Sequence, residues 1–226
     1  MRHEELADNL VRTEERIAAA CQAAGRSRDE VTLVVVTKTW PASDAAILRD
    51  LGVHDLGENR DQEAREKSAL VPGVRWHFVG QVQTNKARSV ATYADVVHSV
   101  DRPSLVDALG HGAVRARRTV EVLLQVSLDG ARGGASPEEL LGLAGQVVAT
   151  DGLVLRGLMA VAPLGQDPAA AFGRLRVLAA ELTAVHASAR VISAGMSGDL
   201  EQAIAAGATH VRVGTAVLGH RSVPLR

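Results

Sequence analysis

Eight short apolar runs recur along the 226-residue chain, and a helix-compatible stretch separates each run from the next. Continuous apolar runs of this length are typical of parallel strands that are buried on both faces. Eight β/α repeats in a chain of this length predict a closed α/β barrel, because eight parallel strands close into a sheet without edges. A doubly wound open sheet is the alternative. The expected strands are 31–38, 53–57, 76–80, 96–100, 120–127, 155–161, 191–194 and 211–214.

The segments around these strands predict one domain with an extra helix at its start. Residues 3–24 repeat apolar side chains at helical spacing, and Gly25 stands where a helix commonly ends. The strongest cluster of turn-forming residues, 129–139, predicts a long loop after the fifth strand. Since no linker divides the chain, we expect residues 1–226 to form a single domain that ends in a short tail, 221–226.

Charge and composition exclude several classes of function. A formal net charge of -1, 2% aromatic residues and the lack of a dense basic run argue against nucleic-acid binding. No apolar run approaches the roughly 20 residues of a membrane span. Cys21 is the only cysteine, which excludes an internal disulfide and a thiolate zinc cluster and fits a reducing cytoplasm. The histidines are scattered without the spacing of a metal site, so we predict no metal.

Lys38 ends the first expected strand, which is where a barrel places its functional side chains. We expect the strand end to desolvate this lysine partly. Desolvation favours the neutral amine, which can attack an aldehyde and form a Schiff base. The alternative is a structural ion pair with a neighbouring carboxylate such as Glu58.

The loops after the seventh and eighth expected strands carry a phosphate-binding pattern. Small residues there let backbone N–H groups close on an anion. The alternative is that Ser197 or Asp199 caps the next helix and that Gly214 marks a tight strand exit. If an anion binds, we expect the Asp199 carboxylate to point away from it. The candidates are Gly195, Ser197, Gly198, Gly214 and Thr215.

Arg212 lies two residues before Gly214, so both residues face the same side of the eighth strand. A guanidinium beside a pyridine nitrogen keeps that nitrogen unprotonated and makes the ring a poorer electron sink. The alternative for Arg212 is a salt bridge at the strand end. Asn59 can contact a ligand or cap a helix, and His77 is expected to be a hydrogen-bonded core histidine.

Motifs along nearly the whole chain carry a family resemblance. They are VVVTKTWP around Lys38, LGENRDQE at 56–63, WHFVGQVQTNK at 76–86, HSVDR at 98–102, RGLMAVAP at 156–163, ISAGMSGDLEQAIAAG at 192–207 and VRVGTAVLG at 211–219. With these motifs the chain resembles the YggS/PROSC family of pyridoxal phosphate homeostasis proteins.

The resemblance implies a fold type III barrel, similar to the N-terminal domain of alanine racemases, that holds pyridoxal 5′-phosphate (PLP) as a Schiff base. An aromatic residue often follows the family's Gly-Glu-Asn motif, whereas Arg60 stands here. Ring packing at the pocket mouth is therefore in question. By motif position, the implied cofactor residues are Lys38 for the Schiff base, Arg212 beside the pyridine nitrogen, Ser197, Gly214 and Thr215 at the phosphate, Met196 as a backbone donor and Asn59 in the pocket wall.

The resemblance also implies a function, which is a cytoplasmic PLP carrier or buffer without catalytic residues. Its partners are then PLP and apo forms of PLP-dependent enzymes, and a monomer is favoured because no helix shows a heptad seam. The alternative is a PLP-dependent amino-acid racemase, which needs a second acid–base group. Tyr93 falls on the helix side of its repeat and Cys21 on the outer helix. A third alternative is a Schiff-base aldolase that uses Lys38 without PLP.

Overall fold

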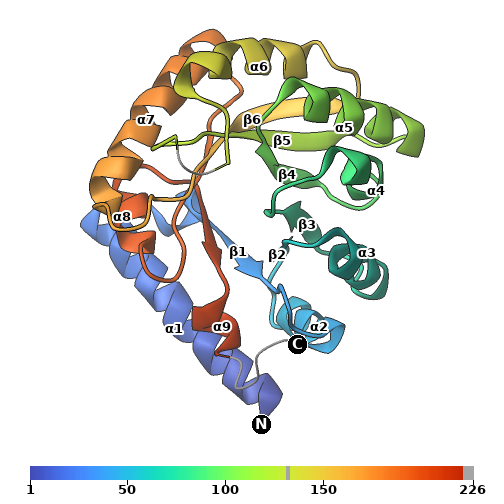
Figure 1. The fold of residues 1–226 in the computed structure, drawn as a ribbon. Coiled ribbons are helices and arrows are strands. Elements are labelled where there is room, and N and C mark those ends of the chain that lie inside the picture. The colour runs from blue at the N-terminus through green and yellow to red at the C-terminus, as the bar shows by residue number, and fades with distance from the viewer. Residues whose placement is uncertain (131–132, 221–226) are drawn as a thin grey trace.

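The computed structural model describes residues 1–130 and 133–220, which fold into a closed barrel of eight parallel strands (Figure 1). The strands pair in chain order, and β1 also pairs with β8. The predicted closed barrel is confirmed, and the open-sheet alternative is wrong. The strands are β1 (Thr32–Val36), β2 (Asp55–Glu58), β3 (Arg75–Phe78), β4 (Val96–Val100), β5 (Val120–Gln125), β6 (Leu153–Met159), β7 (Val191–Ser193) and β8 (His210–Val213).

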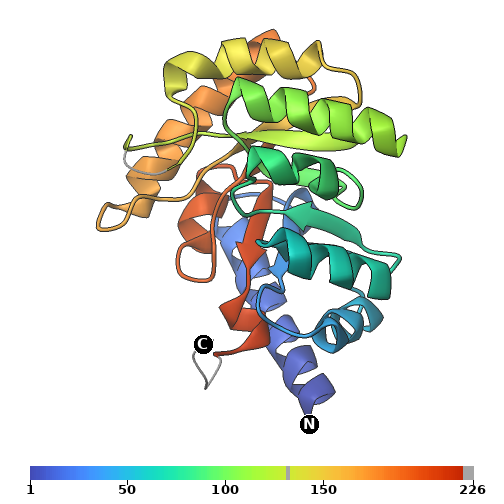
Figure 2. The same cartoon turned by 45° about the vertical axis from the view of Figure 1, so that its right-hand side comes forward.

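Helices cover the outside of the barrel (Figures 1 and 2). Among the described residues, no helix is long and apolar enough to cross a bilayer. The α-helices are α1 (Arg2–Ala23), α2 (Ala42–Asp50), α3 (Asp61–Leu70), α4 (Ala87–Val90), α5 (Pro103–Ala116), α6 (Leu140–Val148), α7 (Pro168–Val185), α8 (Leu200–Ala205) and α9 (Thr215–Leu218). Short 3-10 segments are η1 (Arg28–Glu30), η2 (Thr84–Lys86) and η3 (Pro137–Glu139).

The extra helix expected at the start of the chain is α1. It packs beside α8 and α9, which follow the last two strands (Figures 1 and 2). Leu6, Ile17 and Cys21 form its buried face. The loop predicted at 129–139 contains η3, and its residue Ala135 forms an isolated β-bridge with Val126, which precedes the loop. Residues 131–132 of that loop and the tail 221–226 lie outside the described residues.

Gly157 allows β6 to pass close to β7. The pairing of β5 with β6 shifts register at this point, from Val122–Leu155 to Leu123–Gly157. Gly157 has a φ of +150°, and a Cβ atom on it would lie 1.9 Å from the carbonyl oxygen of Val191. Because that neighbour is backbone, it cannot move aside as a flexible side chain could. Glycine is therefore required at this bulge.

We expect Gly157→Ala to lower the free energy of unfolding by about 2–4 kcal/mol, because it combines backbone strain with overpacking. Urea unfolding followed by circular dichroism measures the change. Gly142→Ala is the control, since a Cβ at this exposed position of α6 meets no atom within 4 Å. It should stabilise the protein by up to about 1 kcal/mol. Equal unfolding midpoints for the two variants would contradict the close approach.

Candidate functional site

A cavity of about 290 Å³ lies at the C-terminal ends of the barrel strands. Its polar wall comes from the ends of β1, β2, β7 and β8, and its apolar wall from β1, β3 and β6. Apart from Gly195, the structure therefore brings together the residues that the sequence singled out for a cofactor, although they span most of the chain. The lining residues are Val36, Lys38, Asn59, Val79, Met159, Val161, Met196, Ser197, Gly198, Arg212, Gly214 and Thr215.

Lys38 lies at this cavity with an exposed side chain. The expectation that the strand end partly desolvates it is wrong, because β1 ends at Val36 and Lys38 lies two residues beyond it. The alternative of an ion pair with Glu58 is also wrong, since Glu58 pairs with Lys67 instead. Among the described residues, the Lys38 amine has neither an ion pair nor a hydrogen bond. It is thus accessible to a ligand.

A buried polar network holds the backbone beneath Lys38. Lys67 Nζ donates to the Thr37 carbonyl oxygen at 2.8 Å and to Glu58 Oε1, and Thr37 Oγ1 donates to the same oxygen at 2.6 Å. Burial raises the pKa of Glu58. Beyond Lys38, Thr39 has a φ of +68°, and its N–H donates to Glu63 Oε2 at 2.9 Å. These contacts fix the two residues that flank the lysine.

The loops after β7 and β8 are joined directly, because the Ala216 N–H donates to Ser197 Oγ at 3.3 Å. The Met196 N–H donates to Asp199 Oδ1 at 2.6 Å, so it is already used within its own loop. Neither Ser197 nor Asp199 makes a side-chain cap of α8, which removes the capping alternative. Gly195 has a φ of +90°, and a Cβ on it would lie 2.6 Å from the Cβ of Ala203. Gly195 is thus needed for the turn and does not line the cavity.

Helix α1 braces both loops from outside. Arg16 donates to the Ser197 carbonyl oxygen at 3.2 Å and pairs with Glu201 at 2.7 Å. Asn9 Nδ2 donates to the Val217 carbonyl oxygen at 2.9 Å, which holds α9. The sequence predicted the helix but gave no sign of this role, because its polar contacts are made to residues about 180 to 210 positions away.

Arg212 forms the buried side of the cavity, with 6% of the residue exposed. Nη1 donates to Ser193 Oγ at 2.6 Å and Nη2 to the Ala160 carbonyl oxygen at 2.9 Å. Burial lowers the pKa of Arg212 to about 10. Among the described residues it has no salt-bridge partner within 4.0 Å, so the strand-end salt bridge is wrong. Its guanidinium is a positive group held by neutral acceptors.

Asn59 lines the cavity, and the capping position of α3 belongs to the next residue, Arg60. Gly80 packs on this segment, since a Cβ there would lie 2.2 Å from the Asn59 carbonyl oxygen. The Arg60 side chain is 68% exposed and pairs with Glu63 at 3.5 Å. It points to solvent and supplies no wall to the cavity.

The sequence reasoning missed the apolar lining residues Val36, Val79, Met159 and Val161. A signal for Val36 existed, because it precedes Lys38 by two positions and so falls on the same face of the strand. The others follow from the same rule once the ends of β3 and β6 are known. Apolar side chains pack against the faces of a flat ring better than polar side chains do, so these four residues suit a ring-shaped ligand.

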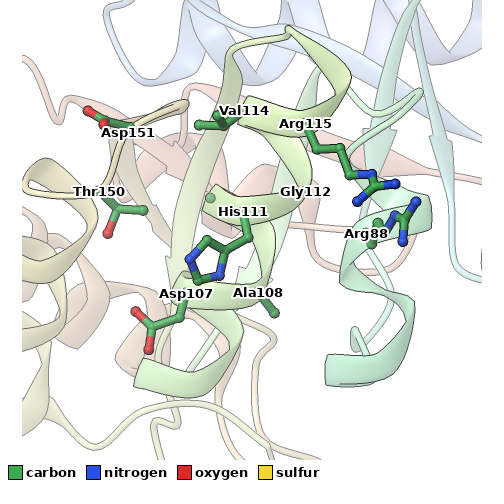
Figure 3. A pocket seen from close by; sticks show the side chains of 10 residues that line it. Arg88, Asp107, Ala108, His111, Gly112, Val114, Arg115, Thr150 and Asp151 are labelled. Atoms are coloured by element: carbon green, nitrogen blue, oxygen red, sulfur yellow. The ribbon is translucent and has the colours of Figure 1, made fainter.

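A larger cavity, of about 710 Å³, lies on the outer helical surface and involves other residues. Figure 3 shows Asp107, His111 and Arg115 projecting from α5, with Arg88 on α4 beside them. The wall is completed by Thr150 and Asp151, in the turn before β6. This cavity has no lysine and receives no C-terminal strand end, so volume alone would select the wrong site for Schiff-base chemistry.

Comparison with known proteins agrees with the fold. The alanine racemase N-terminal domain family matches residues 9–222. Pyridoxal phosphate homeostasis proteins of Mycobacterium tuberculosis and Escherichia coli are 44% and 37% identical, covering 97% and 96% of this chain and 94% and 97% of theirs. The PipY structure of Synechococcus elongatus with PLP bound has a TM-score of 0.82 at 34% identity, covering 95% of this chain and all of that chain.

We expect Lys67→Met to lower the free energy of unfolding by about 3–5 kcal/mol, because it leaves the Glu58 carboxylate buried without its partner. The double variant Glu58→Gln/Lys67→Met should recover part of this loss, since the buried charge is gone. Lys86→Met, at an exposed lysine, is the control and should change stability by less than about 0.5 kcal/mol. Urea unfolding of all four proteins tests this. A Lys67→Met variant as stable as Lys86→Met would refute the network.

Proposed function

The chain belongs to the alanine racemase N-terminal domain family, in the branch of the pyridoxal phosphate homeostasis proteins, and on this premise we propose that it binds PLP through Lys38 and acts in PLP homeostasis. Its role is that of a carrier or buffer for the cofactor, without robust catalytic turnover. The observation that carries the proposal is the meeting of an accessible amine, a buried guanidinium and two small-residue loops in one cavity.

These groups match the parts of PLP. The Lys38 amine nitrogen adds to the aldehyde carbon, and loss of water leaves a C=N bond in place of the C=O bond. Ser197, Gly214 and Thr215 are suited to the phosphate, with Gly198 and Met196 beside them, and Asn59 borders the ring. Bound PLP supplies an electron sink for amino-acid chemistry, and an arginine at its nitrogen weakens that sink. Arg212 thus favours holding the cofactor over using it.

The exposure of Lys38 supports a carrier. A Schiff base forms with loss of water and is hydrolysed by addition of water. A solvent-accessible lysine therefore lets the protein load and release the cofactor. Enzymes that react through such groups usually exclude water from them. The cavity, of about 290 Å³, lies just below the roughly 300–1,000 Å³ typical of ligand pockets, so its size suits one small ligand such as the cofactor.

The lining also argues against racemisation, which needs two acid–base groups on opposite faces of the substrate. Among the described lining residues, the ionisable side chains are Lys38 and Arg212. Tyr93 donates to Asp61 at 3.1 Å, and burial raises its pKa, while Cys21 is buried on α1. His77 is bound inside the barrel. The racemase alternative therefore lacks a second base, and the aldolase alternative lacks a use for Arg212.

The wider setting belongs to the same proposal. We assign one PLP-binding domain to residues 1–226, in a monomer that works in the cytoplasm. The partners would be PLP itself and apo forms of PLP-dependent enzymes that receive it. A low net charge, a single cysteine and relatives named for homeostasis support this setting.

We expect the protein incubated with PLP to be yellow and to lose its visible absorption band on borohydride reduction, because reduction removes the C=N bond. Lys38→Ala should lack the band, whereas Lys86→Ala should keep it. Mass spectrometry of the reduced wild type should find the adduct on the peptide that contains Lys38, the other lysines being Lys67 and Lys86. A wild type that stays colourless with PLP would overturn the proposal and favour the aldolase.

Turnover separates the carrier from the racemase. The PLP-loaded protein should racemise a panel of L- and D-amino acids at a rate no greater than that of an equal concentration of free PLP, because the second base is missing. Circular dichroism of each amino acid over time measures this rate. Sustained racemisation that is well above the rate of free PLP and is lost in Lys38→Ala would replace the carrier with the enzyme.

A further inference from the structure

A continuous chain of hydrogen bonds crosses the interior of the barrel and ends at Arg212. Asp55 Oδ1 lies 2.7 Å from His77 Nε2, and His77 Nδ1 lies 2.8 Å from His98 Nε2. His98 Nδ1 then lies 2.9 Å from Ser193 Oγ, which accepts from Arg212 Nη1 at 2.6 Å. The five residues come from β2, β3, β4, β7 and β8. Only Arg212 among them lines the cavity.

The middle of this chain is cut off from solvent. His77, His98 and Ser193 are 1%, 0% and 0% exposed, and the Asp55 side chain at the far end is 21% exposed. Buried polar groups need partners, since each one left without a hydrogen bond costs about 1–3 kcal/mol. Each of these side chains finds its partners in the chain itself. The chain is thus a fully satisfied network in the core.

The two ends of the chain fix its direction. A guanidinium can only donate, so Ser193 Oγ accepts from Arg212, and we assign the proton of its hydroxyl to the contact with His98 Nδ1. His98 therefore carries its proton on Nε2 and donates it to His77 Nδ1. His77 in turn donates from Nε2 to the Asp55 carboxylate. With the Asp55 carboxylate accepting at the far end, this arrangement gives each contact along the chain one donor and one acceptor.

The electrostatics of the chain agree with this assignment. Burial, together with the nearby Arg212 guanidinium, lowers the pKa of His98 well below its ordinary value, so the ring is neutral. Burial acts to raise the pKa of Asp55, but the hydrogen bond from His77 and the Arg75 guanidinium outweigh it, and the pKa is lowered. A carboxylate at one end and a guanidinium at the other match the direction of the bonds.

We propose that Asp55, His77, His98 and Ser193 are positioning residues that hold the Arg212 guanidinium in a fixed plane for the ligand. Ser193 Oγ accepts a hydrogen bond from Nη1, and the Ala160 carbonyl oxygen accepts one from Nη2. Three N–H groups of the guanidinium remain for other contacts. The chain is a support and not a proton wire, because Arg212 stays charged and can accept no proton at its end. The ligand side of the inference rests on the proposed function.

The network itself is tested without PLP. Nitrogen-15 NMR of the apo protein should show His98 neutral at pH 7, with its proton on Nε2 and with slow proton exchange. His98 protonated on Nδ1, or charged at this pH, would overturn the assigned direction of the chain whatever the protein binds. This measurement uses the wild type, so it remains decisive even where a core variant fails to fold.

The support of Arg212 is tested with Ser193→Ala, which removes the hydroxyl next to the guanidinium. Its PLP affinity should fall about tenfold, as expected for a lost bond to a charged group, and the absorption maximum of its PLP adduct should shift. Ser193→Thr keeps a hydroxyl and should restore both. Ser99→Ala is the matched control, because Ser99 is also 0% exposed on a strand and donates to the Gly80 carbonyl oxygen outside the network.

Asp55→Asn tests the far end of the chain at a partly exposed position that should fold. It removes the charge that orients His77, so the absorption maximum should move in the same direction as in Ser193→Ala, by less. If Ser193→Ala and Asp55→Asn both keep the PLP affinity and the absorption spectrum of the wild type, the positioning role is overturned, even though the wild type binds PLP. A wild type that binds no PLP would instead overturn the proposed function and leave the NMR result standing.

Discussion

The pairing of β1 with β8 closes the barrel, and the whole site depends on it. Val34 lies opposite Arg212 in that pairing, so the strand that leads to Lys38 runs beside the strand that leads to Gly214. Parallel strands end on the same rim, which is why residues about 170 positions apart share one cavity. Helix α1 reinforces the closure from outside, because it packs on α8 and α9 and binds the carbonyl groups of both loops.

Two buried polar networks give this rim its rigidity. One joins Thr37, Glu58 and Lys67 beneath the lysine, and the other runs through the core to Arg212. A buried polar or charged group is costly unless it finds hydrogen-bond partners, so both networks restrict the conformations available to the strand ends. The lysine between them stays exposed. The site thus combines a rigid frame with an accessible amine, an arrangement suited to reversible attachment.

Much of the fold and of the site could be predicted from the sequence, because local patterns and recognised motifs carried the information. Runs of β-branched residues gave the strands, since their period depends only on neighbours along the chain. Together with the family motifs, the position of Lys38, Arg212, Gly214 and Ser197 at or near the ends of those runs gave the cavity lining. The errors concerned environment: Lys38 was expected to be desolvated and is exposed, and Glu58 was a possible partner for it but binds Lys67.

The sequence by itself determined the barrel, the place of Lys38 at its rim and the end of the barrel that carries the cavity, because strand alternation is a local property of the chain. Only the tertiary structure decided which polar groups meet inside. His77 was expected to be a hydrogen-bonded core histidine, but its partners, Asp55 and His98, lie about twenty residues away on other strands. Ser193 and Arg212 join them because strands seven and eight complete the circle. Such contacts depend on register and closure, which no local pattern contains.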